Sequence, residues 1–322
     1  MSAIHDRFSG LFIPQVTPFN QDGALDEESL TLLTKYFAEI GSVAGLVSCA
    51  RIGESPVLSL AEKRRVYEIS GKAVRDAGKT HIAAIAPQST DEAVNLMRDL
   101  ENLPVDGVMI FPPLLFAWGK VDPELKVRFF EDVARETKLP VVLFQIPVKS
   151  YYYAPDTICR IARLDNVVAF KEASFDIHLF TDTIQALKRD QAVMRVLTGN
   201  DRFVAESYKL GANGALIGVA NVATEKWGAL DIAGRAGKSA EAAAIQKELE
   251  SVKELVFSEP IVEAVARIKV VLQHEGLIKT AKVRRPQLGV SEMEQKQLLD
   301  SYNALKRNEF RGGLEGKRHA VG

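Results

Sequence analysis

The sequence contains only two cysteines, Cys49 and Cys159, which stand far apart in the chain. Two isolated thiols form neither a disulfide framework nor a metal-binding spacing, and a reducing compartment is the simpler expectation. The N-terminus lacks the apolar core of a secretory signal, and no run of about 18 apolar residues could span a bilayer. We therefore expect a cytoplasmic protein with no membrane partner.

Charge of either sign is not in excess. The 41 basic and 42 acidic residues leave a formal charge of −1, which provides no long-range field for nucleic acid or an anionic membrane. His178 and His274 have no partner at a metal-ligand spacing, so no metal site is predicted. With 322 residues, of which 47% are hydrophobic, the chain can bury the core of one large domain.

Short apolar runs alternate with longer amphipathic stretches over the first 220 residues or so, as in repeated β-α units on a parallel sheet. The predicted strands are 11–16, 43–48, 81–86, 107–111, 140–145, 167–171, 194–199 and 214–218. The predicted helices between them are 27–40, 60–77, 90–101, 123–137, 156–163, 175–189 and 202–210. Asp26, Ser89 and Asp122 stand where N-caps belong.

Eight such units in this length predict an α/β protein with a closed TIM (β/α)₈ barrel over residues 1–221. An open doubly wound sheet would more usually carry five to seven strands, and no GxGxxG follows the first strand. Residues 222–306 are helical in pattern, so we expect a C-terminal helical extension packed on the barrel or on a neighbouring subunit. The polar, glycine-containing tail 307–322 is expected to be disordered.

Lys171 ends the apolar run of the sixth predicted strand and is followed at once by Glu172. Catalytic groups of (β/α)₈ barrels lie at this level, where strands end and loops begin. An amine that is partly desolvated there has a lowered pKa and can attack a carbonyl carbon to form a Schiff base. The alternative is a structural lysine that pairs with Glu172 or reaches solvent.

Several segments resemble one known family in the same order along the chain. They are PQVTPFNQDGALDEESL (14–30), GLVSCARIGESPVLSLAEKRRV (45–66), DGVMIFPP (106–113), PVVLFQIP (140–147), VVAFKEAS (167–174), TGND (198–201), LGANGALIGVANV (210–222) and VRRPQLGVSEME (283–294). This text resembles the dihydrodipicolinate synthase/N-acetylneuraminate lyase family, the class I Schiff-base aldolases and dehydratases of pyruvate and other 2-oxo acids. The resemblance implies that Lys171 is the Schiff-base lysine.

Two of that family's functional positions differ here. Relatives read Gly-Thr-Thr-Gly-Glu after strand two, whereas this chain reads Ala50-Arg51-Ile52-Gly53-Glu54. We expect this loop, with Arg51, Ile52 and Gly53, to bind the substrate; Arg51 would hold its carboxylate or, alternatively, pair with Glu54. Relatives also end strand five with a proton-shuttling tyrosine, where this chain has Phe144, which cannot ionise but is expected to contact the substrate.

Further candidates follow from position at the strand ends. Asn200 and Asp201 are expected to contact substrate hydroxyls or, alternatively, to cap the helix that begins near 202. By resemblance, Gly218 lies near the substrate carboxylate. The group that replaces the missing tyrosine as proton relay is sought among four side chains: Ser48, Cys49, Tyr151 and Tyr152.

The resemblance thus implies a lyase that joins pyruvate or another small 2-oxo acid to Lys171 and makes or breaks a carbon–carbon bond, without a cofactor. One alternative is a dehydratase or deaminase of a 2-oxo-3-deoxy sugar acid. Another is a non-catalytic binding protein for 2-oxo acids or sugar acids on the same fold. By resemblance, the chain is expected to form a homo-oligomer, a dimer or a homotetramer.

Overall fold

A computed structural model describes the backbone of residues 2–319 and the side chains of residues 4–307; in this part of the chain eight strands close into one barrel. Each strand pairs in parallel with its neighbours in the sequence, and β8 pairs with β1. This confirms the predicted TIM barrel. The strands are β1 (Gly10–Pro14), β2 (Val43–Ser48), β3 (Thr80–Ile85), β4 (Gly107–Ile110), β5 (Val141–Gln145), β6 (Val167–Glu172), β7 (Arg195–Thr198) and β8 (Gly214–Leu216).

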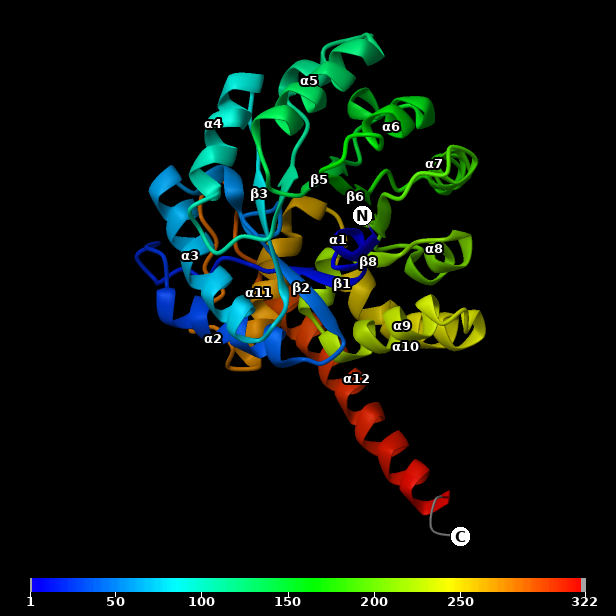
Figure 1. The fold of residues 1–322 in the computed structure, drawn as a ribbon. Coiled ribbons are helices and arrows are strands. Elements are labelled where there is room, and N and C mark those ends of the chain that lie inside the picture. The colour runs from blue at the N-terminus through cyan, green and yellow to red at the C-terminus, as the bar shows by residue number, and fades with distance from the viewer. Residues whose placement is uncertain (1, 320–322) are drawn as a thin grey trace.

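Helices surround the barrel in alternation with the strands, as Figure 1 shows. They are α2 (Glu27–Glu39), α3 (Leu60–Asp76), α4 (Thr90–Leu100), α5 (Pro123–Glu136), α6 (Pro155–Ile161), α7 (Ile177–Arg189) and α8 (Val204–Leu210). Asp26, Ser89 and Asp122 accept hydrogen bonds from the first turns of α2, α4 and α5, which confirms all three as N-caps. A short helix, α1 (Ser2–Asp6), lies across one end of the barrel (Figure 1).

Two separate groups of buried side chains show which way each strand residue faces. The smaller group includes Phe12, Val47, Met109 and Leu216, with Ile4 of α1 packed against it. The larger group includes neighbours of these residues and the apolar faces of the helices. Since successive strand residues face opposite sides, the smaller group fills the barrel interior and the larger group lies between strands and helices.

The C-terminal extension packs on the barrel. It consists of α9 (Thr224–Arg235), α10 (Ser239–Val256), α11 (Ala264–His274) and α12 (Glu292–His319), with a one-turn helix η5 (Ile261–Glu263) before α11. Lys269 of α11 forms a buried ion pair with Glu54, which follows β2. Helix α12 runs past the predicted boundary at 306 to His319, so disorder of the tail 307–322 stays a prediction; residues 320–322 lie outside the described residues.

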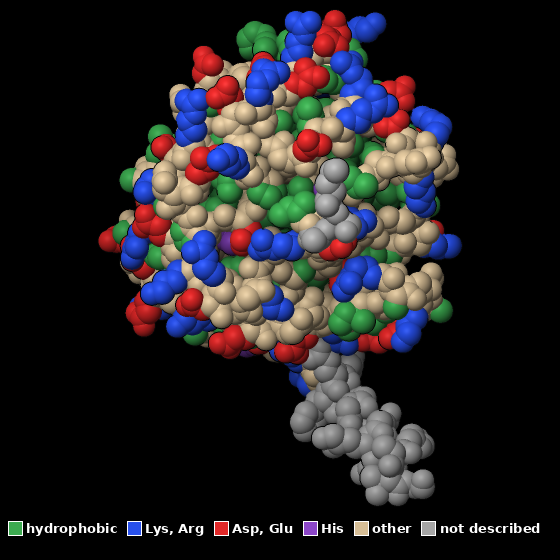
Figure 2. All heavy atoms as spheres, viewed as in Figure 1, with side chains coloured by type: hydrophobic (Ala, Val, Ile, Leu, Met, Phe, Trp, Pro, Cys, Tyr) green, Lys and Arg blue, Asp and Glu red, His purple; other side chains and the backbone are tan. Residues whose placement is uncertain are grey.

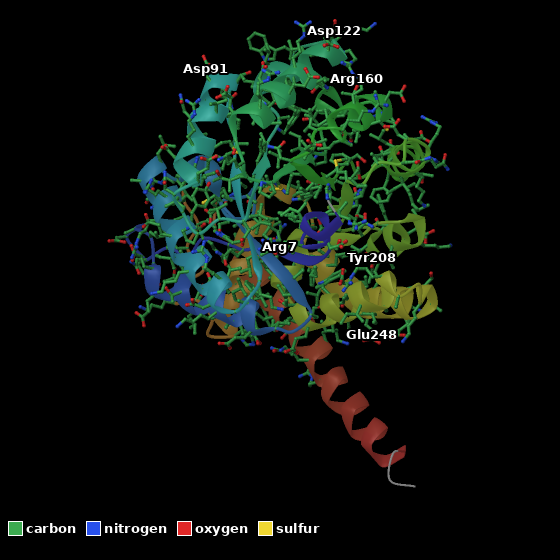
Figure 3. All side chains as sticks on the ribbon, viewed as in Figure 1. Arg7, Asp91, Asp122, Arg160, Tyr208 and Glu248 are labelled. Atoms are coloured by element: carbon green, nitrogen blue, oxygen red, sulfur yellow. The ribbon has the colours of Figure 1, made fainter. Side chains whose placement is uncertain are left out.

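Charged side chains are spread over the outer helices. Lys and Arg are mixed with Asp and Glu over the face shown in Figure 2. In Figure 3 the labelled Asp91, Asp122 and Arg160 lie on the outer ring around the barrel, where Arg160 pairs with Glu124 at 2.7 Å. Within the described residues, no helix is long and apolar enough to cross a membrane.

Candidate active site

Lys171 faces the barrel interior because of an irregularity in β6. Val141 pairs with Val167 but the next residue, Val142, pairs with Ala169, so Val168 is an extra residue in the strand. Val168 and Ala169 both belong to the interior group, whereas Phe170 belongs to the outer group. The β-bulge-like shift therefore directs Lys171 inward, beside Phe144 of β5 and Leu197 of β7.

The Lys171 side chain is half-buried against an aromatic wall. Its Nζ atom lies 4.3 Å from the centroid of the Phe144 ring, and Phe111 meets that ring edge-on at 4.8 Å. Desolvation lowers the pKa of Lys171 to about 8; Asp201 opposes this decrease and Arg51 adds to it. Lys171 thus combines a lowered pKa with a position at the open end of a parallel barrel.

Arg51 lies at the rim of the site and does not form an ion pair with Glu54. Its Nη2 atom donates to the carbonyl of Ile261 in η5 at 3.1 Å. The residue is exposed as a whole, yet desolvation of the guanidinium lowers its pKa, and Asp201 opposes this decrease. The Glu54 carboxylate is instead bonded to Lys269 and accepts from the Arg284 amide at 3.1 Å, so the alternative Arg51–Glu54 pair does not form.

The neighbours of Arg51 in the loop are buried. The Gly53 carbonyl accepts a hydrogen bond from Thr17 at 2.8 Å, and Ile52 packs beside Gly218. A Cβ atom on Gly218 would lie 3.0 Å from Ile52 and 3.1 Å from Phe257 of the extension. A glycine at position 218 therefore lets the extension approach the β8 end of the barrel.

Asp201 is a buried carboxyl group of the site whose role the sequence left open. It follows β7, and its Oδ1 atom accepts from the Val219 amide at 3.0 Å. Burial raises the pKa of Asp201 to about 6, although this amide, Lys171 and Arg51 all favour its charged form. Asp201 also lines a cavity of about 340 Å³ whose other walls include Ile261 and the charged residues Arg202 and Lys253.

Asn200 and Glu172 belong to a hydrogen-bond network on the outer side of the strands. The Asn200 amide nitrogen donates to Glu172 Oε2 at 2.7 Å, and its oxygen accepts from the Phe175 amide at 2.7 Å. Glu172 Oε1 also accepts from Gln145 at 2.8 Å. Both ends of the Asn200 amide are thus engaged, which does not favour the expected substrate contact. Helix capping is wrong as well, since α8 begins after Phe203 with no side-chain cap.

Ser48 and Cys49 are turned away from Lys171, contrary to the expected relay role. Val47 faces the interior, so its neighbour Ser48 faces outward, where its hydroxyl lies 2.9 Å from His81 Nε2. Cys49 packs in the outer group, and burial raises the pKa of its thiol to about 12. A thiol with this pKa does not exchange protons readily at neutral pH.

The three consecutive tyrosines have different surroundings. Tyr152 donates its hydroxyl hydrogen to the Ser174 carbonyl at 2.6 Å, and burial raises its pKa. Tyr153 is buried, and its ring packs edge-on against Phe130. Tyr151 ends the short helix η3 (Lys149–Tyr151) and packs partly buried against the outer group. These contacts place none of the four expected relay residues beside Lys171, and a relay role for Tyr151 stays a prediction.

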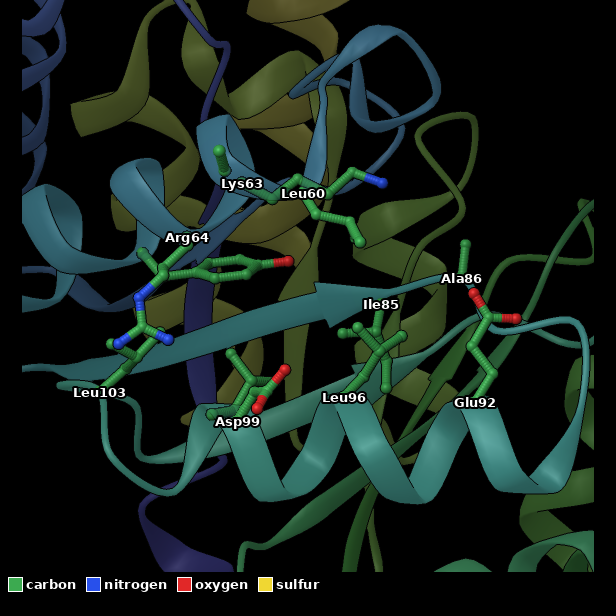
Figure 4. A pocket seen from close by; sticks show the side chains of 12 residues that line it. Leu60, Lys63, Arg64, Ile85, Ala86, Glu92, Leu96, Asp99 and Leu103 are labelled. Atoms are coloured by element: carbon green, nitrogen blue, oxygen red, sulfur yellow. The ribbon is translucent and has the colours of Figure 1, made fainter.

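A second cavity, of about 240 Å³, lies between α3 and α4 on the helix side of β3 (Figure 4). Leu60 and Arg64 of α3 face Leu96 and Asp99 of α4 across it. Its lining residues do not include Lys171, Arg51 or Asp201, so it is separate from the candidate active site.

Comparisons with known proteins agree with this geometry. Residues 7–305 match the model of the "Dihydrodipicolinate synthetase family". The chain is 33% identical over 286 residues to a 4-hydroxy-tetrahydrodipicolinate synthase of Moorella thermoacetica, covering 88% of this chain and 93% of the relative. The enzyme of that name from Bacillus subtilis is 29% identical over 300 residues, covering 92% and 99%. The crystal structure of dihydrodipicolinate synthase from Thermotoga maritima superimposes with a TM-score of 0.84 at 26% identity, covering 92% and 98%.

Proposed function

Since the chain belongs to the dihydrodipicolinate synthetase family, we propose that it is a lyase that forms an imine between Lys171 and a small 2-oxo acid such as pyruvate. The imine then serves as the electron sink for making or breaking a carbon–carbon bond. The relatives are named for one such synthase activity. Phe144 and Arg51 stand where relatives carry different groups, so the proposal covers the reaction class and not their particular product.

The observation that carries this proposal is the environment of Lys171. With a pKa of about 8, roughly a tenth of the amine is neutral at pH 7. That fraction is roughly 300 times larger than for a lysine at the ordinary value of 10.5. The neutral amine is the nucleophile that attacks the carbonyl carbon, so the barrel raises its concentration before any substrate binds.

Arg51 and Asp201 supply the other groups that the reaction needs. We assign the substrate carboxylate to Arg51, whose guanidinium can bind it through two parallel hydrogen bonds. Asp201, with a pKa of about 6, can take up and return a proton near neutral pH. It replaces the tyrosine that relatives use, because Phe144 has no proton to transfer.

Reductive trapping tests the proposal. The protein is mixed with pyruvate, reduced with borohydride, digested and examined by mass spectrometry, and a pyruvyl adduct is expected on Lys171. Lys171→Arg keeps the charge but cannot form the imine, so it serves as the matched control. Absence of an adduct with pyruvate and with other 2-oxo acids would refute the proposal. Asp201→Asn is expected to keep the adduct and to lose turnover.

The same experiment separates the alternative functions. An adduct that never turns over, with any aldehyde or sugar acid, would favour a binding protein, which the loss of the tyrosine at Phe144 makes a specific alternative. Turnover of a 2-oxo-3-deoxy sugar acid with release of water would favour a dehydratase. We also propose assembly into a homo-oligomer, which light scattering of the full chain would measure.

A further inference from the structure

One sector of the barrel rim is rich in apolar side chains. Residues 107–118, which form β4 and the first part of the loop after it, contain no charged, hydroxyl or amide side chain. The neighbouring strand β5 ends in Phe144, Gln145 and Ile146, and Gln145 is turned outward to Glu172. The side chains of this sector that contact Lys171 or its aromatic neighbour, Phe144 and Phe111, are therefore apolar.

These apolar side chains form a continuous surface from Lys171 to solvent. Phe144 contacts Lys171, Phe111 contacts Phe144, and Phe111 and Ile146 are both partly exposed beside the interior group. The one-turn helix η2 (Leu114–Ala117) packs beside η3, and the surface continues over η2 and Val148, the residue before η3. Its outer part consists of exposed residues: Leu114 (51%), Leu115 (52%), Trp118 (73%) and Val148 (46%).

The opposite sector is covered by the chain itself. Arg51 bonds to Ile261 of the extension, and Phe257 of the extension lies against Gly218 after β8. A 2-oxo acid held between Arg51 on the β2 side and Lys171 on β6 therefore meets the extension on the side of β7 and β8. Phe144 of β5 and Phe111 after β4 lie on the other side of Lys171.

We propose that the reaction partner of the 2-oxo acid is an aromatic or bulky apolar aldehyde, whose ring packs on Phe111, Phe144 and Ile146. This inference rests on the proposed function and names its substrate class. A polyhydroxylated aldehyde would bury its hydroxyl groups against this surface without hydrogen-bond partners, and each unsatisfied group weakens binding. An aromatic ring instead gains edge-to-face contact with Phe111.

In the cleavage direction, the substrate is a 4-aryl-4-hydroxy-2-oxo acid bound to Lys171 as the protonated, positively charged imine. The C3–C4 bond breaks, and its electron pair forms the C2=C3 double bond of an enamine while the imine nitrogen becomes neutral. The C4 hydroxyl passes its proton to the Asp201 carboxylate and becomes the aldehyde C=O. Asp201 returns this proton to C3, and water then hydrolyses the imine to release pyruvate and free Lys171.

The test compares two aldehydes after the pyruvate adduct on Lys171 has been shown. Condensation of pyruvate with benzaldehyde and with D-glyceraldehyde is followed by mass spectrometry of the hydroxy-oxo acid products. The expected result is a kcat/KM for benzaldehyde at least roughly tenfold higher, since each unpaired hydroxyl costs about a factor of ten. Equal rates, or a preference for glyceraldehyde, overturn the inference and leave the imine intact. No adduct removes the proposed function and this inference with it.

Variants test the apolar surface itself. Phe111→Asn is expected to lower the benzaldehyde/glyceraldehyde ratio roughly two- to tenfold, because it removes one aromatic contact. If Phe111 were only structural, Phe111→Asn would lower both rates alike and leave the ratio unchanged. The ratio would also stay unchanged if the apolar surface served only as a contact between copies of the chain. Phe144→Tyr keeps the ring, adds a hydroxyl, and is expected to raise glyceraldehyde turnover. Val193→Ala, at an exposed apolar residue before β7, is the matched control.

Discussion

Replacing Glu54 by glutamine is expected to destabilise the protein strongly. The Glu54 and Lys269 side chains are 1% and 0% exposed, so their ion pair is fully buried. Lys269 also donates to the Lys282 carbonyl at 2.8 Å and lies 4.2 Å from the Phe19 ring centroid. Glutamine preserves the shape of the side chain but leaves this ammonium without a counter-charge. Removal of one partner from such a pair costs about 3–5 kcal/mol.

Urea unfolding of Glu54→Gln at pH 7 measures this loss. The pKa of Lys269 is already lowered to about 8 by burial, so the loss is expected to shrink toward pH 9, where the amine is neutral. Replacing both residues, Glu54→Gln with Lys269→Met, should recover much of the loss because neither charge is then buried. Glu136→Gln, in the exposed pair with Arg98, should cost less than about 1 kcal/mol. A loss for Glu54→Gln no larger than this control would refute the reasoning.

Two further predictions concern Arg51 and His81. Arg51→Ala is expected to raise the pyruvate concentration for half-maximal adduct formation by roughly tenfold or more and to leave the melting temperature nearly unchanged. A large drop in melting temperature at unaltered affinity would show a structural role. His81 bonds Ser48 and the Pro104 carbonyl, and burial lowers its pKa to about 4. In the unfolded chain the pKa of His81 is about 6.5, so the unfolded state binds the proton first as the pH falls. This difference should lower the free energy of unfolding by about 2 kcal/mol between pH 7 and pH 5. Urea unfolding at both pH values measures this loss, and His81→Gln should flatten it.

The barrel could be predicted from the sequence because its physical signal is local. Eight apolar runs at regular spacing indicate eight strands, and residues such as Asp26 and Ser89 mark where helices begin. Lys171 stands out as a lysine at the end of an apolar strand, but position alone left a structural lysine open, and the resemblance to a known family made it the catalytic candidate. The end of α12 could not be predicted, since a polar tail gives no strong signal for or against a helix.

The direction of each side chain in β2 could not be predicted. The run Val43–Ser48 contains small and apolar residues throughout, so alternation does not distinguish its two faces, and it does not show that Ser48 faces His81 and not Lys171. Asn200 and Asp201 were equally ambiguous. The partner that engages Asn200 is Glu172, which lies 28 positions away, and the partner of Asp201 is the Val219 amide. Such choices are made by tertiary contacts.

Because Val168 is an extra residue in β6, the position of the Lys171 amine depends on the pairing register of the strand as well as on its amino-acid composition. The same residues paired without this offset would alternate regularly from Val167, with Val168 facing inward and Ala169 outward. The Lys171 amine would then point at the helices, where no substrate can reach it. In related chains, the same short sequence motif therefore indicates a Schiff-base lysine only when its strand pairs with the preceding strand in the same shifted register.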